Sequence, residues 1–154
     1  MTEKIKAAAL LAAAIAIPSE GLRQYAYRDP VGILTVCYGE THNVQAGRKY
    51  SLQECIGMLD ESMAKAVKQV DQCVPGLPVE TLAAFSDAVF NMGPTIACDK
   101  KRSTAARKLA AGDWKGACNE LPKWDKAKVG GFLISLPGLT NRRKKEQELC
   151  LKNL

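Results

Sequence analysis

The stretch from Glu20 to Thr35, EGLRQYAYRDPVGILT, carries the clearest structural pattern of this 154-residue chain. It contains several aromatic and β-branched residues, and Pro30 and Gly32 mark a turn, as expected for two antiparallel strands joined by a short loop. We therefore expect a small antiparallel sheet within residues 22–50, of which residues 39–50 form a polar loop.

Two carboxyl groups, Glu20 and Asp29, lie nine residues apart in unlike surroundings. Glu20 follows an almost wholly apolar segment, where desolvation raises the pKa of a carboxyl group and keeps it protonated, as a general acid requires. Asp29 lies in a polar turn that favours the ionised form, and the Thr35 hydroxyl can hold a water molecule. Such a pair suits an acid and a base, although the same spacing on its own is common on protein surfaces.

The segment before Glu20 is uncharged and rich in alanine from residue 7 to residue 17. It predicts a helix over residues 2–17, ended by Pro18. Its apolar run is shorter than the roughly 20 residues of a transmembrane helix. Three interpretations stay open: a buried helix, a cleaved signal peptide, and a weakly apolar export anchor that later leaves the membrane. Cleavage near Ala16 is disfavoured because it removes the helix that supports Glu20.

Downstream of the sheet, apolar residues recur at the spacing of helices. Ser51 and Glu54 form a capping box that opens a long helix ending near Asp71. The remaining segments are expected as a helix over residues 79–92 ended by Gly93-Pro94, a short helix over residues 103–111, a helix capped by Asp113, loops around Trp124 marked by Pro122 and Gly130-Gly131, and a last helix over residues 137–152.

These elements place the chain in the α+β class, as one domain whose length suits a sizeable core. A small N-terminal antiparallel sheet region and a helical C-terminal lobe are joined by the long helix. We expect a cleft between the two parts, which is a usual place for a polymer substrate.

The net charge of +6 and the pI of about 9.0 favour anionic partners without choosing among nucleic acid, membrane surfaces and wall polymers. Aromatic residues make up only 6% and do not alternate with basic ones, which argues against nucleic acid. The basic run at residues 142–145 is interpreted as a solvated helix face, with a contact to an anionic polymer as the alternative.

The six cysteines show no CxxC spacing and the chain has one His, which argues against a metal site. An even number of dispersed cysteines is typical of disulfides in an oxidising compartment, with buried reduced thiols as the alternative. Fifteen pairings are open to six cysteines. The simplest joins neighbours in the chain, as Cys37–Cys55, Cys73–Cys98 and Cys118–Cys150.

The whole pattern resembles the phage-type lysozymes of glycoside hydrolase family 24. That family has Glu, eight residues, Asp, five residues and Thr within an E-G…Y-x-D…G-x-x-T-x-G-Y-G framework, and both spacings are kept here. Cys37 and Glu40 depart from it, where members often have Gly and His. The resemblance continues in Phe90-Asn91-Met92-Gly93, Trp124, Gly130-Gly131, Leu136-Pro137-Gly138-Leu139 and Arg142-Arg143.

The resemblance implies a muramidase that needs no cofactor and no metal. Glu20 is expected to protonate the glycosidic oxygen, and Asp29 and Thr35 to position and activate the water, with inversion. The implied target is the β-1,4 bond between N-acetylmuramic acid and N-acetylglucosamine. The candidate substrate contacts are Gly32, Asn91 and Trp124, for which a turn, a helix cap and loop packing are the structural alternatives.

The six-cysteine arrangement resembles exported endolysins of phages that infect Gram-negative bacteria. Residues 1–18 are then an N-terminal helix that can serve as an export anchor, and residues 19–154 are a lysozyme-like catalytic domain. The expected partner of this monomer is peptidoglycan, in the periplasm of a Gram-negative host. A transient association with the inner membrane through residues 1–19 is also expected, and no nucleic acid.

Two alternatives remain. One is a lytic transglycosylase or chitinase on the same scaffold, which the presence of both Asp29 and Thr35 disfavours because a transglycosylase needs only the acid. The other is a cationic protein without enzymatic activity that binds the wall or the membrane.

Overall fold

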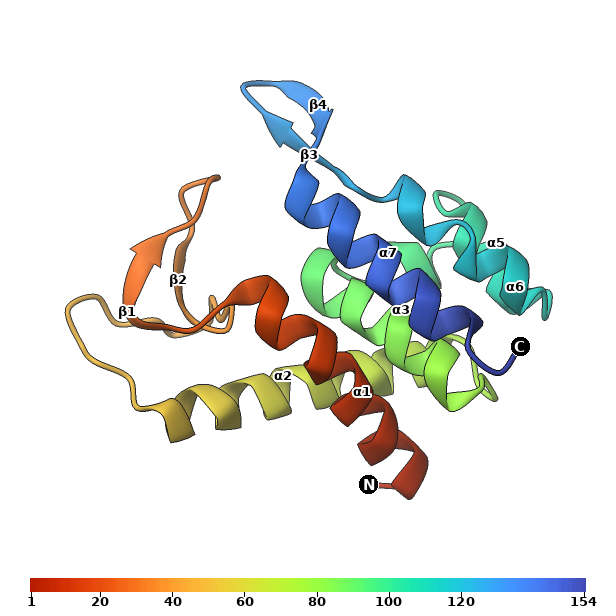
Figure 1. Ribbon diagram of the computed structural model, residues 1–154, viewed down its shortest axis with the longest axis horizontal. Helices are drawn as coiled ribbons and strands as arrows, with labels where there is room; N and C mark the ends of the chain where they lie inside the picture. Colours follow the sequence, from red (N-terminus) through yellow and green to blue (C-terminus); the bar gives the residue numbers. More distant parts are fainter.

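The computed structural model describes all 154 residues, which form helices around a buried centre and two separate antiparallel hairpins (Figure 1). The elements in chain order are α1 (Glu3–Glu20), β1 (Arg23–Arg28), β2 (Leu34–Cys37), α2 (Leu52–Cys73), α3 (Val79–Met92), α4 (Thr95–Cys98), α5 (Thr104–Ala110), α6 (Trp114–Cys118), the 3-10 helix η1 (Leu121–Lys123), β3 (Lys126–Val129), β4 (Phe132–Ser135) and α7 (Pro137–Leu151).

Helix α1 continues past the proline that was expected to end it. Pro18 lies inside its last turn, and the Gly21 N–H donates to the Ile17 carbonyl at 3.0 Å and closes that turn. Proline has no N–H, so this turn lacks one backbone hydrogen bond, yet the helix continues to Glu20. Glu20 is consequently the last helical residue, held on a regular backbone.

The alanines of α1 pack against α2 and α3. The buried face consists of small side chains and one isoleucine, which allows the helices to approach closely; its members are Ala8, Ala12, Ala13, Ile15 and Ala16. They belong to the same core cluster as the apolar residues of α2 and α3. None of the helices combines the length and the apolarity that crossing a membrane requires.

Helix α3 lies at the centre, in contact with α1, α2 and α7 (Figure 1). Every residue from 81 to 89 is buried, and this includes Asp87. Helix α2 begins as expected, because Ser51 and Glu54 form both hydrogen bonds of the capping box. It extends from the central helices to the first hairpin and so connects the two parts of the molecule (Figure 1).

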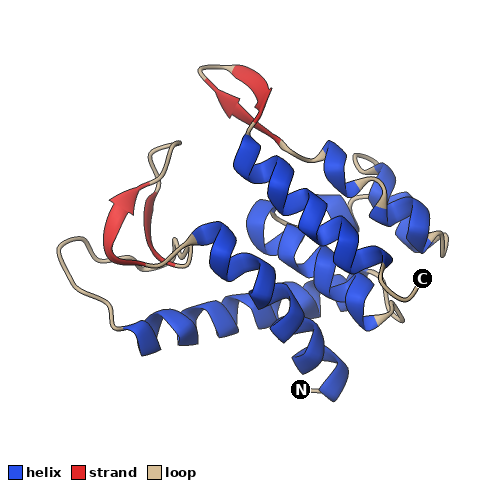
Figure 2. Ribbon diagram, in the orientation of Figure 1, coloured by secondary structure: helices blue, strands red, loops and turns tan.

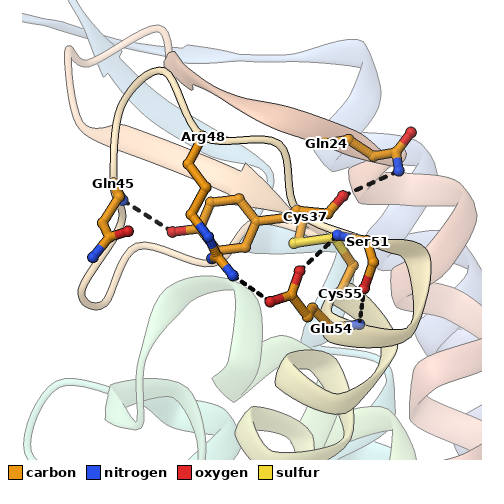
Figure 3. Close-up of a disulfide and its surroundings, with 8 residues drawn as sticks. Gln24, Cys37, Gln45, Arg48, Ser51, Glu54 and Cys55 are labelled. Atoms are coloured by element: carbon orange, nitrogen blue, oxygen red, sulfur yellow. Dashed lines mark hydrogen bonds and ion pairs between the residues drawn. A yellow bond between two sulfur atoms is a disulfide. The ribbon is translucent and has the colours of Figure 1, made fainter.

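The first hairpin forms where the sequence predicts it. Strands β1 and β2 pair antiparallel, with Tyr27 opposite Thr35. The disulfide between Cys37 of β2 and Cys55 of α2 links this hairpin to the start of the long helix, beside the Ser51–Glu54 capping box (Figure 3). The hairpin is thus attached covalently to the element that carries it.

The other two disulfides are Cys73–Cys98 and Cys118–Cys150, and no cysteine is free. All three pairs match the pairing of neighbours expected from the sequence. The alternative of six reduced thiols does not apply to this structure.

A second hairpin, β3–β4, occupies the region around Gly130-Gly131 where only loops were expected (Figure 2). Both glycines have positive φ, +59° and +85°, which suits a two-residue type I′ turn between strands. The signal was present in the sequence, because Gly-Gly between β-forming residues is typical of a hairpin.

The interpretation of residues 142–145 as a solvated face is wrong for its first half. Arg142 and Arg143 are buried, whereas Lys144 and Lys145 are exposed. The two arginines face α3 because each finds polar partners there.

Candidate active site

A cavity of about 880 Å³ opens between the first hairpin, α2 and the end of α3. Glu20 lines it from the end of α1, Asp29 and Thr35 from the first hairpin, and Asn91 from α3. Four of the residues expected in the site therefore meet in one cavity. Gly32 and Trp124 do not line it.

The Glu20 carboxyl group lies between a guanidinium and a glycine. Its Oε1 accepts a hydrogen bond from Arg142 Nη1 at 2.5 Å. A Cβ atom at Gly39 would lie 2.7 Å from its Oε2, and the φ of Gly39 is +77°. Any other residue is strained on this backbone, and its Cβ would displace the Glu20 carboxyl group. The expected apolar surroundings of Glu20 are therefore wrong, because its nearest partner is a charged group.

Arg142 is itself held by Asp87 through two hydrogen bonds. Its Nε and Nη2 donate to Asp87 Oδ2 and Oδ1 at 2.9 and 2.8 Å. Burial lowers the pKa of the Arg142 guanidinium, but hydrogen bonds and charge from Asp87 and then Glu20 outweigh this and raise it above its ordinary value. Arg142 is therefore a permanent cation that connects α3 to the end of α1.

Arg143 forms a second buried cluster next to the first. Its Nη2 donates to Asn91 Oδ1 at 2.6 Å, and its Nε lies 2.9 Å from Glu146 Oε2. Both charged side chains are fully buried, and burial raises the pKa of the Glu146 carboxyl. Because the Asn91 oxygen is engaged by Arg143, its amide nitrogen is the free donor of that side chain.

Asp29 is held by its own turn. The backbone N–H groups of Val31 and Ile33 donate to its Oδ1 at 3.0 and 2.8 Å. The other oxygen, Oδ2, has no partner within the protein and can accept a proton or a hydrogen bond from water. The buried Thr35 hydroxyl donates to the Ile33 carbonyl at 2.9 Å and keeps its lone pairs available.

Gly32 and Trp124 lie outside the cavity and contribute to the fold. Gly32 has a φ of +88°, and its N–H donates to the Asp29 carbonyl, so it closes the turn that holds Asp29. Trp124 is partly buried and packs against the core away from the cavity.

The sequence did not reveal the roles of Arg142 and Gly39, which adjoin Glu20, or of Asp87, which holds Arg142. A charged residue within the apolar helix 79–92 was a usable signal for a buried ion pair, since buried charges are almost always paired. It could not name the partner, 55 positions away.

One wall of the cavity is polar and was also missed. The Glu40 carboxylate accepts from Ser62 Oγ at 2.8 Å and from the His42 N–H at 2.9 Å. Glu61 and Lys65 of α2 line the same wall. No group of three His, Cys, Asp or Glu side chains lies close enough to hold a metal ion.

Comparison with known families decides how this cavity is classified. The phage lysozyme family matches residues 18–146, which is most of the chain. The chain belongs to the phage lysozyme family. It is a phage endolysin, a glycoside hydrolase that degrades peptidoglycan, and this confirms the fold class and the enzyme class expected from the sequence.

Two relatives in this family cover most of the chain. The SAR-endolysin of Bacteriophage PS119 is 37% identical over 134 residues, which are 86% of this chain and 76% of the relative. The SAR-endolysin of Enterobacteria phage PA-2 is 35% identical over 162 aligned positions, which cover 96% of this chain and 94% of the relative.

Among solved structures of phage lysozymes, the active form of the P1 phage endolysin Lyz superposes with a TM-score of 0.78 at 27% identity, over 92% of this chain and 83% of that one. The secreted inactive form of the same endolysin superposes with a TM-score of only 0.52 at 27% identity, over 71% and 74%. The fold described here is thus closer to the active form.

Proposed function

We propose that this phage lysozyme is an inverting muramidase that hydrolyses the β-1,4 bond between N-acetylmuramic acid and N-acetylglucosamine. Glu20 is the general acid that protonates the glycosidic oxygen, and Asp29 is the base that takes a proton from the attacking water. Thr35 holds that water. The observation that carries the proposal is the common cavity of all three side chains.

The contacts of Glu20 assign its two oxygens different roles. Oε1 accepts from Arg142, whose guanidinium can only donate hydrogen bonds, so Oε1 cannot carry a proton on that side. The proton that Glu20 transfers in the proposed reaction is therefore carried by Oε2, next to Gly39. Gly39 has no side chain, and Oε2 occupies the space that a Cβ atom would fill.

The contacts of Asp29 likewise leave one oxygen free for chemistry. Two backbone N–H groups fix Oδ1, so Oδ2 is left to accept a hydrogen bond from the attacking water. The Thr35 hydroxyl, whose proton is engaged by Ile33, acts as an acceptor for the second hydrogen of that water. The water is then oriented with a lone pair towards the sugar.

The reaction product tests the proposal. Purified peptidoglycan digested by the oxidised protein should release chains that end in reducing N-acetylmuramic acid, and nuclear magnetic resonance of the first product should show the α anomer. Anhydro-muramic ends would identify a transglycosylase instead. A β anomer as first product would exclude inversion, for which the carboxyl groups stand about 6.5–9.5 Å apart rather than about 5–5.5 Å.

We also propose that the chain is exported to the periplasm of a Gram-negative host as a monomer, with a transient tether to the inner membrane through residues 1–19. Its SAR-endolysin relatives, its three disulfides and the uncharged run at residues 7–17 support this. Protein isolated from the periplasm should contain no titratable thiol. Six free thiols in that material would contradict export as an oxidised protein.

A further inference from the structure

The β3–β4 hairpin exposes four large apolar side chains within six residues. Val129, Phe132, Leu133 and Ile134 are 48, 74, 65 and 42% exposed. The hairpin projects from the start of α7, away from the central helices (Figures 1 and 2). Exposed apolar groups of this kind usually mark an interaction surface.

The apolar side chains lie on both faces of the hairpin. Val129 pairs with Phe132, and the next pair is Lys128 with Leu133. Successive pairs of an antiparallel ladder point to opposite faces, so Phe132 and Leu133 point in opposite directions. A groove on a partner protein would cover one face only, whereas a bilayer covers both.

The hairpin is held in place at its base. The Leu136 N–H donates to the Asp125 carbonyl at 3.1 Å, and the hydroxyls of Ser135 and Thr140 donate to the Asp125 carboxylate at 3.4 and 2.7 Å. The exposed tip is therefore attached to α7 and is not a frayed end. These contacts fix the hairpin relative to α7, so the exposure of its tip is part of the fold.

The charge of the hairpin defines the kind of bilayer. Residues 126–135 contain two lysines and no acidic residue, and Lys128 forms no ion pair. Between Lys128 and Ser135 no side chain can donate or accept a hydrogen bond, so a glycan would find no polar side chain there. Lysines beside an apolar tip instead suit anionic headgroups above acyl chains.

We propose that the β3–β4 hairpin docks on anionic phospholipid, with its apolar tip among the acyl chains and Lys128 at the headgroups. This surface is separate from the cavity that contains Glu20, since no residue of the hairpin lines that cavity. It gives the enzyme a second contact with a membrane, independent of α1.

Flotation with vesicles tests the proposal on the oxidised full chain. Wild type should bind vesicles of phosphatidylethanolamine and phosphatidylglycerol and bind phosphatidylcholine vesicles much less. The double variant Phe132→Ser/Leu133→Ser should lose at least roughly tenfold in partitioning, because both side chains lose their transfer into the apolar phase. Lys128→Gln should weaken binding to the anionic vesicles only.

Two matched variants separate this surface from others. Leu52→Ser removes a comparably exposed leucine at the start of α2, where the leucine is 48% exposed, and should bind like wild type. Leu10→Ser changes the exposed face of α1. If Leu10→Ser abolishes vesicle binding while the hairpin double variant keeps it, α1 is the membrane contact and the proposal is overturned.

Measurements of hydrolysis and of binding to sacculi distinguish a lipid contact from a substrate contact of the hairpin. The hairpin double variant should hydrolyse soluble glycan fragments at the wild-type rate and bind isolated sacculi normally. Loss of either with unchanged vesicle binding would assign the hairpin to the substrate and reject a lipid contact. These results do not depend on whether Glu20 is the general acid, so the two proposals fail separately.

Discussion

The two carboxyl groups proposed for catalysis, Glu20 and Asp29, are held in different ways. Glu20 depends on residues far away in the chain, because Arg142 lies 122 positions from it and is itself fixed by Asp87 of α3. Asp29 depends on two backbone N–H groups at most four positions away. The acid is therefore positioned by the packing of α1, α3 and α7, and the base by the conformation of one turn.

This difference determines which changes each carboxylate can tolerate. The Glu20–Arg142–Asp87 cluster is largely buried, and removal of Asp87 takes away both hydrogen bonds that hold the buried Arg142 guanidinium to α3. The Asp29 turn lies on a hairpin attached to α2 by a disulfide. Changes in the cluster should lower stability and activity together. Changes that loosen the Asp29 turn should lower activity more than stability.

Asp87→Ala should produce the largest loss of stability. It leaves the Arg142 cation buried without its bidentate partner, which should cost about 3–5 kcal/mol of the free energy of unfolding. Urea denaturation followed by circular dichroism measures this loss. Asp87→Asn keeps a hydrogen-bond acceptor and should lose less; equal stability of Asp87→Ala and wild type would show that the cluster does not hold the helices together.

Removing the disulfide of the first hairpin should have the next largest effect. Cys37→Ser/Cys55→Ser opens a loop with a sequence separation of 18, which should cost roughly 3 kcal/mol in the chain-entropy model. Hydrolysis should also fall, because the hairpin carries Asp29.

The matched control is Cys73→Ser/Cys98→Ser, which opens a loop with a separation of 25 at the other end of α2. It should lose similar stability and keep its activity at temperatures where the protein remains folded. If both double variants lose activity equally, the first disulfide has no special relation to the site.

Gly39→Ala should have a small effect on stability and a larger one on hydrolysis. The left-handed backbone at Gly39 costs an alanine about 1–2 kcal/mol. The added methyl group also displaces Glu20 Oε2, and a shift of about 1 Å in a catalytic group can lower the rate roughly 100-fold.

Gly112→Ala controls for the backbone alone. Gly112 has a φ of +79° and open space where a Cβ would lie. Its variant should show the same loss of stability in thermal unfolding and a normal rate of hydrolysis. A normal rate in Gly39→Ala as well would mean that Gly39 does not position the acid.

The same contrast explains what the sequence could predict. The Asp29 turn, the capping box at Ser51 and the β1–β2 hairpin depend on residues close together in the chain, and local patterns predicted all three. The order of the cysteines and the simplest pairing also predicted the disulfides found here.

The surroundings of Glu20 could not be predicted in this way. The apolar segment before it suggested an apolar site, but α7 brings Arg142 to the end of α1 across most of the chain. A run of four basic residues is interpreted as a solvated face when it is unknown which side of the helix packs against α3. Only the isolated charge at Asp87, within an apolar helix, pointed to a buried partner.

The Glu20→Gln variant tests the central claim most directly, with Glu148→Gln on the exposed face of α7 as its control. Hydrolysis of purified peptidoglycan should fall roughly 100- to 10,000-fold or more in Glu20→Gln, since glutamine cannot donate the proton. Its thermal unfolding should confirm a folded protein, and Glu148→Gln should retain the wild-type rate. A folded Glu20→Gln variant that cleaves glycan at the wild-type rate would contradict the assignment of Glu20 as the acid.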